Sequence, residues 1–150
     1  LATQILDPIV DQFGPIALTY GFCSPELVRK IAKNRNPHIA PKLDQHCSHE
    51  LNQNQKIICD RLGAACDFTL VSNKDDKPID MQKVAQWMCE NLKFDRLYYY
   101  GKNRPIHISI GPQMNQFIQT MKTNADTGHR VPSKKGRNET AIAVIRQVDY

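Results

Sequence analysis

Several features are missing from this 150-residue chain, and each absence narrows what the protein can be. No apolar run approaches the roughly 20 residues that a membrane-spanning helix needs, so we expect no transmembrane segment and no membrane partner. The chain begins at Leu1 without a basic region followed by an apolar stretch, so no signal peptide is recognisable. We expect the chain to be a piece of a longer protein.

The cysteine pattern also excludes a class of site. The five cysteines form no CxxC pair, which argues against a four-cysteine zinc knuckle. Their odd number, in a chain long enough to bury a core without cross-links, predicts free thiols and a reducing compartment. We therefore expect a cytoplasmic location.

The charge is unevenly distributed along the chain. The net charge is +5, with a pI near 9.0. Much of the basic excess comes late, at Lys122, His129, Arg130, Lys134, Lys135, Arg137 and Arg146. Such a segment can attract nucleic acid or another acidic polymer. A solvated cationic surface without a partner is the alternative interpretation.

Apolar spacing predicts the secondary structure. Helical periods are found in residues 2–13, in a segment that starts at Ser24-Pro25-Glu26, and in a segment that starts near Pro78 and includes residues 81–92. Strands are predicted at residues 16–22 and 63–71, and a hairpin at residues 97–100 and 106–110. We further predict a turn at residues 73–76, a short helix at residues 112–121, loop or linker beyond residue 122, and one edge strand at residues 141–148.

This order predicts an α+β domain with a small antiparallel sheet and flanking helices. We assign residues 1–121 to the domain and residues 122–150 to a basic C-terminal extension.

Two polar residues stand out on predicted strands. His107 lies in the alternating stretch of residues 106–110, so it shares one face with Ser109 while the isoleucines share the other. Asp67 follows small and apolar residues, where a buried carboxylate costs several kcal/mol unless a cation compensates. Together with a histidine-rich loop upstream, they predict a metal site with nitrogen and oxygen ligands. An ordinary surface or core role for each residue is the alternative.

Three segments resemble the zinc D-alanyl-D-alanine carboxypeptidases and dipeptidases, whose fold is shared with phage endolysin peptidases and the hedgehog signalling domain. Residues 20–26 (YGFCSPE) are similar to that family's Gly-Tyr-Arg-Ser-Pro-Glu turn, and residues 62–68 (LGAACDF) to its Gly-x-Ala-x-Asp-Phe strand. Residues 94–97 (FDRL) and 105–109 (PIHIS) resemble its closing hairpin with the last histidine. The match covers roughly residues 5–111.

The resemblance implies a zinc ion held by His, Asp and His, with water in the fourth position. Asp67 and His107 match directly. The family's first histidine lies seven residues before the aspartate, where this chain has Asp60. Residues 40–46 (APKLDQH) resemble the approach to that ligand, so His46 is the first choice, His49 the alternative and Asp60 the third.

Two family residues are replaced in this chain. Cys23 stands where the family has a substrate-holding arginine, and Arg104 stands where it has its catalytic acid, three residues before the last histidine. A hydrolytic zinc site needs a base to take the proton from the bound water, and the candidates for it in this chain are Glu50, Asp60 and Asp95. Cys23 is either a nucleophile paired with a histidine or, as we favour, an inert buried thiol.

The resemblance and its two departures lead to three candidate functions. The first is a zinc-dependent hydrolase of the D,D-peptidase type, which cleaves an amide in a peptidoglycan-like peptide. The second is a non-catalytic module that keeps a metal and binds nucleic acid or a protein. The third is a hydrolase of a different, anionic substrate, with Arg104 as the contact for the anion.

Overall fold

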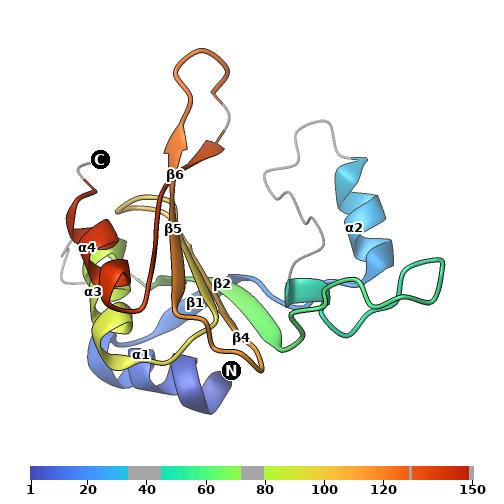
Figure 1. The fold of residues 1–150 in the computed structure, drawn as a ribbon, viewed down its shortest axis with the longest axis horizontal. Helices are drawn as coiled ribbons and strands as arrows, with labels where there is room; N and C mark the ends of the chain where they lie inside the picture. Colours follow the sequence, from blue (N-terminus) through green and yellow to red (C-terminus); the bar gives the residue numbers. More distant parts are fainter. Residues whose placement is uncertain (34–44, 72–79, 129, 149–150) are drawn as a thin grey trace.

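The structure, a computed structural model, describes residues 1–33, 45–71, 80–128 and 130–148. Its centre is a six-stranded sheet with the strand order β1-β2-β4-β3-β5-β6 (Figure 1). The strands are β1 (Ile16–Tyr20), β2 (Ala64–Leu70), β3 (Arg96–Tyr99), β4 (Ile106–Ile110), β5 (Phe117–Thr123) and β6 (Arg130–Arg137). An α+β architecture is therefore confirmed.

The sheet is mixed, which corrects the expectation of a purely antiparallel one. The predicted hairpin of β3 and β4 is present, and β2 pairs antiparallel with β4. Strands β3 and β5, however, pair in parallel. The chain passes through β4 before it returns to the other side of β3, so β5 runs in the same direction as β3.

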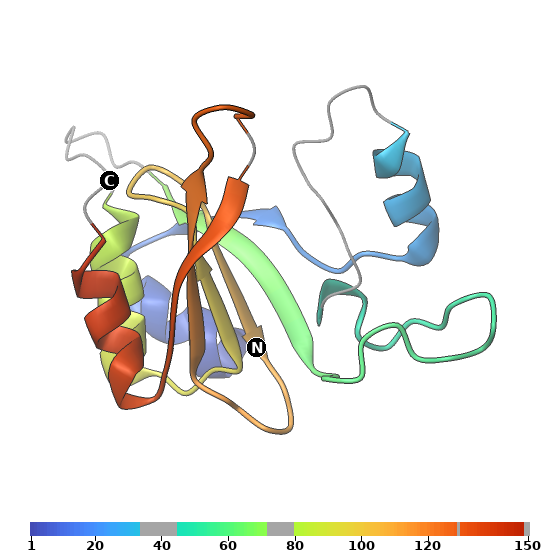
Figure 2. The same cartoon turned by 45° about the horizontal axis from the view of Figure 1, so that its top comes forward.

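The helices divide into two groups (Figures 1 and 2). A π-helical turn (η1, Ala2–Leu6) leads into α1 (Asp7–Phe13), which lies with α3 (Met81–Asn91) and α4 (Glu139–Arg146) on one side of the sheet. Helix α2 (Pro25–Ala32) and the short 3-10 helix η2 (Gln45–Cys47) lie away from these three. Helix α2 begins as predicted, with the Ser24 hydroxyl accepting a hydrogen bond from the Leu27 N–H at 3.2 Å.

The core lies between the sheet and helices α1, α3 and α4. Alternate strand residues point into it, among them Phe68, Leu97, Ile106, Ile108 and Ile118. The intervening residues face the opposite side of the sheet, which we call the open face. His107 and Ser109 of β4 belong to the open face, as their alternation with the isoleucines predicts.

The C-terminal predictions were wrong. The expected helix at residues 112–121 is replaced at its end by strand β5, the expected loop contains strand β6, and the expected edge strand is helix α4. The apolar residues Ala141, Val144, Ile145 and Val148 recur at intervals of three and four, which is a helical period, and all four are buried in the core. The proposed boundary between residues 121 and 122 lies inside β5.

Some expectations fall on residues that the structure does not describe. They are the helix start near Pro78, the turn at residues 73–76, His129, and residues 40–44 of the segment before His46. Among the described residues, no helix combines the length and apolarity needed to cross a bilayer. All five cysteines are unpaired and buried, so free thiols are confirmed.

Candidate metal centre

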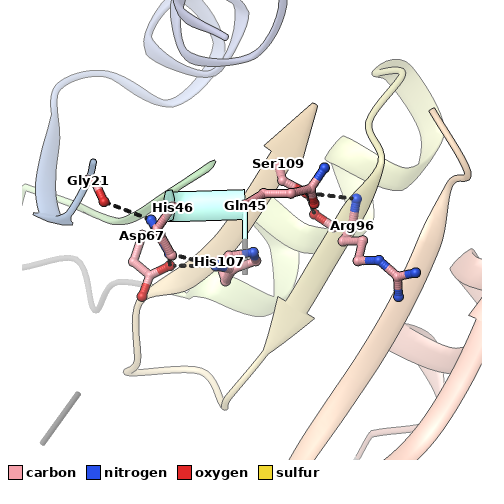
Figure 3. Close-up of polar contacts among 7 residues, drawn as sticks. All are labelled: Gly21, Gln45, His46, Asp67, Arg96, His107 and Ser109. Atoms are coloured by element: carbon pink, nitrogen blue, oxygen red, sulfur yellow. Dashed lines mark hydrogen bonds and ion pairs between the residues drawn. The ribbon is translucent and has the colours of Figure 1, made fainter. Parts of the chain in front are cut away.

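His46, Asp67 and His107 meet on the open face (Figure 3). The His107 Nδ1 atom lies 2.8 Å from Asp67 Oδ1. The His46 Nε2 atom lies 3.2 Å from the same oxygen and 3.1 Å from His107 Nδ1. One nitrogen or oxygen atom from each residue therefore forms a small triangle, and this group, the triad, can hold a metal ion.

The triangle has the size that a tetrahedral ion requires. Ligands at about 2.0–2.1 Å from zinc in a tetrahedron are separated by about 3.3 Å. The three distances in the triad, 2.8, 3.1 and 3.2 Å, are slightly shorter than that. A small outward movement would make room for the ion. Three protein ligands would leave the fourth position open for water or a substrate.

Strand pairing places two of the ligands. Asp67 of β2 and His107 of β4 are directly opposed in the antiparallel register, so their side chains emerge side by side on the open face. Asp67 retains 24% exposure of its side chain, whereas the two histidines are buried. The triad thus has one side open to solvent.

His46 is positioned from outside the sheet. The His46 Nδ1 atom lies 2.8 Å from the carbonyl oxygen of Gly21, and the His46 carbonyl accepts a hydrogen bond from the Cys23 N–H at 3.0 Å. A carbonyl oxygen can only accept, so Nδ1 carries the proton and donates it. The Nε2 atom is left as the ligand that faces Asp67.

Gln45 anchors the segment that carries His46. Its amide nitrogen donates to the carbonyl oxygens of Leu62 at 2.9 Å and Ile110 at 3.2 Å, and to Asp95 Oδ2 at 2.8 Å. Its amide oxygen accepts from the Ser109 hydroxyl at 2.7 Å. These bonds fasten η2 to β4, which carries His107, and to the residues just before β2 and β3.

The electrostatics of the triad favour a charged Asp67. Burial alone would raise the pKa of this carboxyl, but the hydrogen bond from His107 and the interactions with His46 outweigh burial and hold the pKa below its usual value. A carboxylate that stays ionised is the form that coordinates a metal. A bound cation would take the place of the proton between His107 Nδ1 and Asp67, so metal binding should weaken as the pH falls.

Two tyrosines flank the histidines. The Tyr98 ring stacks on His107 with 4.7 Å between ring centroids and 18° between planes. The Tyr20 ring meets His46 edge-on at 4.5 Å. Both contacts restrict rotation of the imidazoles and so favour a single geometry of the triad.

The other predicted site residues lie elsewhere. His49, the alternative ligand, is exposed in a turn after η2, and Asp60, the third choice, is also exposed. Arg104 is exposed in the turn between β3 and β4. Cys23 has no exposed surface, and its thiol donates only to the neighbouring Ser24 carbonyl, which fits the inert thiol that we favoured.

None of the three acids named as substitute bases contacts the triad. Glu50 and Asp60 form no hydrogen bond or ion pair with it among the described residues. Asp95 is buried, and its two oxygens accept from Gln45 and from both the main chain and side chain of Asn115. Asp95 therefore supports the loops around the site.

Sequence reasoning missed the role of Gln45. A glutamine beside a histidine has no distinctive pattern, and its partners lie 17 to 65 positions away. Ser109 was placed on the correct face, but no signal linked it to Gln45.

A comparison with protein-family models, curated proteins and solved structures finds no match to this chain.

Proposed function

We propose that this chain is a zinc-dependent hydrolase that resembles the D-alanyl-D-alanine peptidases and cleaves an amide in a peptidoglycan-like peptide. The observation that carries the proposal is the triangle of His46, Asp67 and His107. Its residue types and their order along the chain are those of the family that the sequence resembles. A hedgehog-like arrangement of the domain is part of the same proposal.

The three resembling segments also converge around the triad. The turn at residues 20–26 contributes the Gly21 carbonyl and the Cys23 N–H that hold His46. The segment at residues 62–68 contributes Asp67, and the hairpin contributes His107. This convergence supports the proposal.

Zinc at this site would polarise the scissile carbonyl and acidify a bound water molecule. His46 Nε2, Asp67 Oδ1 and His107 Nδ1 would hold it, with the Gly21 carbonyl fixing the protonation of His46. Tyr98 and Tyr20 would restrict the rings. The open side of Asp67 gives a substrate its approach.

Two measurements test the proposal. Elemental analysis of the purified protein should find one equivalent of zinc, and the zinc-loaded protein should release D-alanine or a dipeptide from muropeptides. The absence of turnover with zinc, cobalt or manganese would exclude the hydrolase.

His46→Ala and His49→Ala form a matched pair for the metal site. Loss of one of three ligands should weaken zinc binding by at least about 100-fold in the first variant. The second variant should bind zinc as the unmodified chain does, because His49 is exposed and outside the triad. Equal effects of the two substitutions would contradict the assignment of the ligands.

A non-catalytic metal module is the second candidate. It is favoured by the position of Glu50, Asp60 and Asp95, none of which contacts the triad. Stoichiometric zinc together with inactivity toward muropeptides is the result that this candidate expects.

A further inference from the structure

The triad lies at one end of a row of residues across the open face. Strand register aligns Asp67 with His107, His107 with Tyr98, Tyr98 with Gln119, and Gln119 with Lys135. A second row, one step along the strands, runs through Ser109, Arg96, Phe117 and Arg137. The open face therefore continues from the metal ligands on β2 and β4 to the cationic edge strand β6.

Packing fixes the direction of the cations on β6. A side chain at Gly136 would collide with the Thr140 carbonyl and Val144, so position 136 faces helix α4. The Lys134 ammonium also turns toward that side, where it donates to the Gln147 carbonyl at 2.9 Å. Its neighbour Lys135, and Arg137, consequently face the same side as the triad.

Within the part of the chain that the structure describes, none of the three cations of this surface forms an ion pair. The guanidinium carbons of Arg96 and Arg137 lie 4.6 Å and 5.5 Å from the centre of the Phe117 ring. Among the described residues, neither arginine nor Lys135 forms an ion pair, and the buried Arg96 Nε has no hydrogen-bond partner. A buried donor without an acceptor costs about 1–3 kcal/mol, which a bound anion would offset. Figure 3 shows the Arg96 guanidinium extending away from the triad.

We propose that Arg96, Lys135 and Arg137 form an anion subsite that holds a carboxylate of the peptide bound at the triad. The proposal rests on the proposed function for the nature of the substrate. The sequence suggested Arg104 as the contact for an anion, but Arg104 is exposed in the turn between β3 and β4. The proposed subsite instead uses residues that share a face with the triad.

The spacing of the strands sets the distance between subsite and triad. Three strand steps separate His107 from Lys135, or about 14 Å at about 4.8 Å per step. An extended peptide covers this distance with about four residues. The subsite therefore selects peptides with an acidic group about three to four residues from the scissile amide.

A peptide carboxylate fits this surface better than a nucleic acid does. Single strands are held by exposed rings on which bases stack, together with cations distributed along the backbone. Here Tyr98 already stacks on His107, Phe117 lies beneath two arginines, and Tyr100 lies beneath Arg130. Lys135 and Arg137 lie on the edge strand at one end of the rows, the Arg96 guanidinium reaches toward them over Phe117 of β5, and the other end carries Asp67.

Binding of labelled peptides to the zinc-loaded protein tests the subsite. Fluorescence anisotropy would compare fluorescein-labelled hexaglutamate, hexaglutamine and an oligothymidylate of similar length. We expect hexaglutamate to bind best, and Lys135→Gln with Arg137→Gln to raise its Kd by about tenfold or more. Thermal melting would verify that this double variant is folded.

The matched control removes the same charge elsewhere. Lys83→Gln with Lys102→Gln affects exposed residues outside the two rows and should change the Kd by less than about twofold. Equal weakening by both double variants, equal binding of hexaglutamine, or tighter binding of oligothymidylate would each overturn the proposal. Anisotropy does not require turnover, so an inactive protein that binds hexaglutamate through these residues would refute the hydrolase alone.

Discussion

Asp95 is a buried carboxylate that supports the loops around the triad and does not belong to it. Burial would raise the pKa of its carboxyl, but hydrogen bonds from Asn115 and Gln45, with the nearby charge of Arg96, outweigh burial and lower that pKa. A carboxyl whose pKa is lower in the folded state than in the unfolded state stabilises the protein above its unfolded pKa of about 3.9. This contribution is lost as the pH falls through the folded pKa.

We predict that Asp95→Asn lowers the free energy of unfolding by about 1–3 kcal/mol at pH 7, because hydrogen-bond acceptors for buried donors are lost. The difference from the unmodified chain should shrink as the pH falls from about 4, the unfolded pKa, through the lower pKa of the folded state. Urea unfolding at neutral and acid pH measures both effects. Asp11→Asn, on an exposed helix position, should change stability by less than about 0.5 kcal/mol at either pH.

At the scale of single residues, the sequence alone was enough to predict Asp67 and His107 as members of the candidate site. A carboxylate among small apolar residues and a histidine on an alternating strand are both conspicuous, and strand pairing brings them together. The choice of His46 needed the family resemblance, since His49 is a histidine in the same loop. Gln45 could not be found, because its partners lie on three other segments.

At the scale of the elements, the short helix η2 is held by side-chain hydrogen bonds of Gln45. It has only three residues, too few for a helix to hold itself together, and Gln45 ties it to β4 and to Leu62, just before β2. The same element carries the ligand His46. The geometry of the triad should therefore depend on Gln45, a residue outside the triad.

We predict that Gln45→Ala weakens zinc binding by about 10–100-fold and lowers stability by about 1–3 kcal/mol. Competition with a chelator measures the affinity, and thermal melting measures the stability. Gln113→Ala, in an exposed loop near Asn115, provides a control that should alter neither by much. Unchanged zinc affinity in Gln45→Ala would show that η2 is held by other contacts.

Local patterns located most elements before the C-terminal third. Helix α2 has its cap and proline, and the β3–β4 hairpin has alternating residues on both sides of a turn. Strand β6 was missed because most of its residues are polar and exposed, which gives an edge strand the composition of a loop. Its pairing with β5 becomes visible only in three dimensions.

For the molecule as a whole, helix α4 completes the core. Ala141, Val144, Ile145 and Val148 pack there, and the Gln82 amide donates to the carbonyls of Ile145 and Val148 at 3.1 and 3.0 Å. A buried aliphatic side chain contributes about 1.5–3 kcal/mol, and a domain of this size is stable by only about 5–15 kcal/mol.

We predict that a chain ending at residue 137 loses cooperative unfolding, because several such contributions disappear together. Circular dichroism with thermal melting would reveal the loss. Arg146→Ala in the full chain removes only an exposed ion pair with Glu90 and should change stability by less than about 1 kcal/mol. A sharp transition in the shortened chain would mean that residues 138–148 are an appendage after all.

The three residues of the triad come from parts of the chain that are far apart: His46 and Asp67 are 21 positions apart, and Asp67 and His107 are 40 positions apart. An ion coordinated by all three would act as a cross-link that closes two long loops. The unfolded chain has no preformed site that could bind the ion in the same way. Chelation would then do more than empty the site. It would remove the cross-link between η2 and the sheet. The melting temperature would therefore rise with the concentration of free zinc.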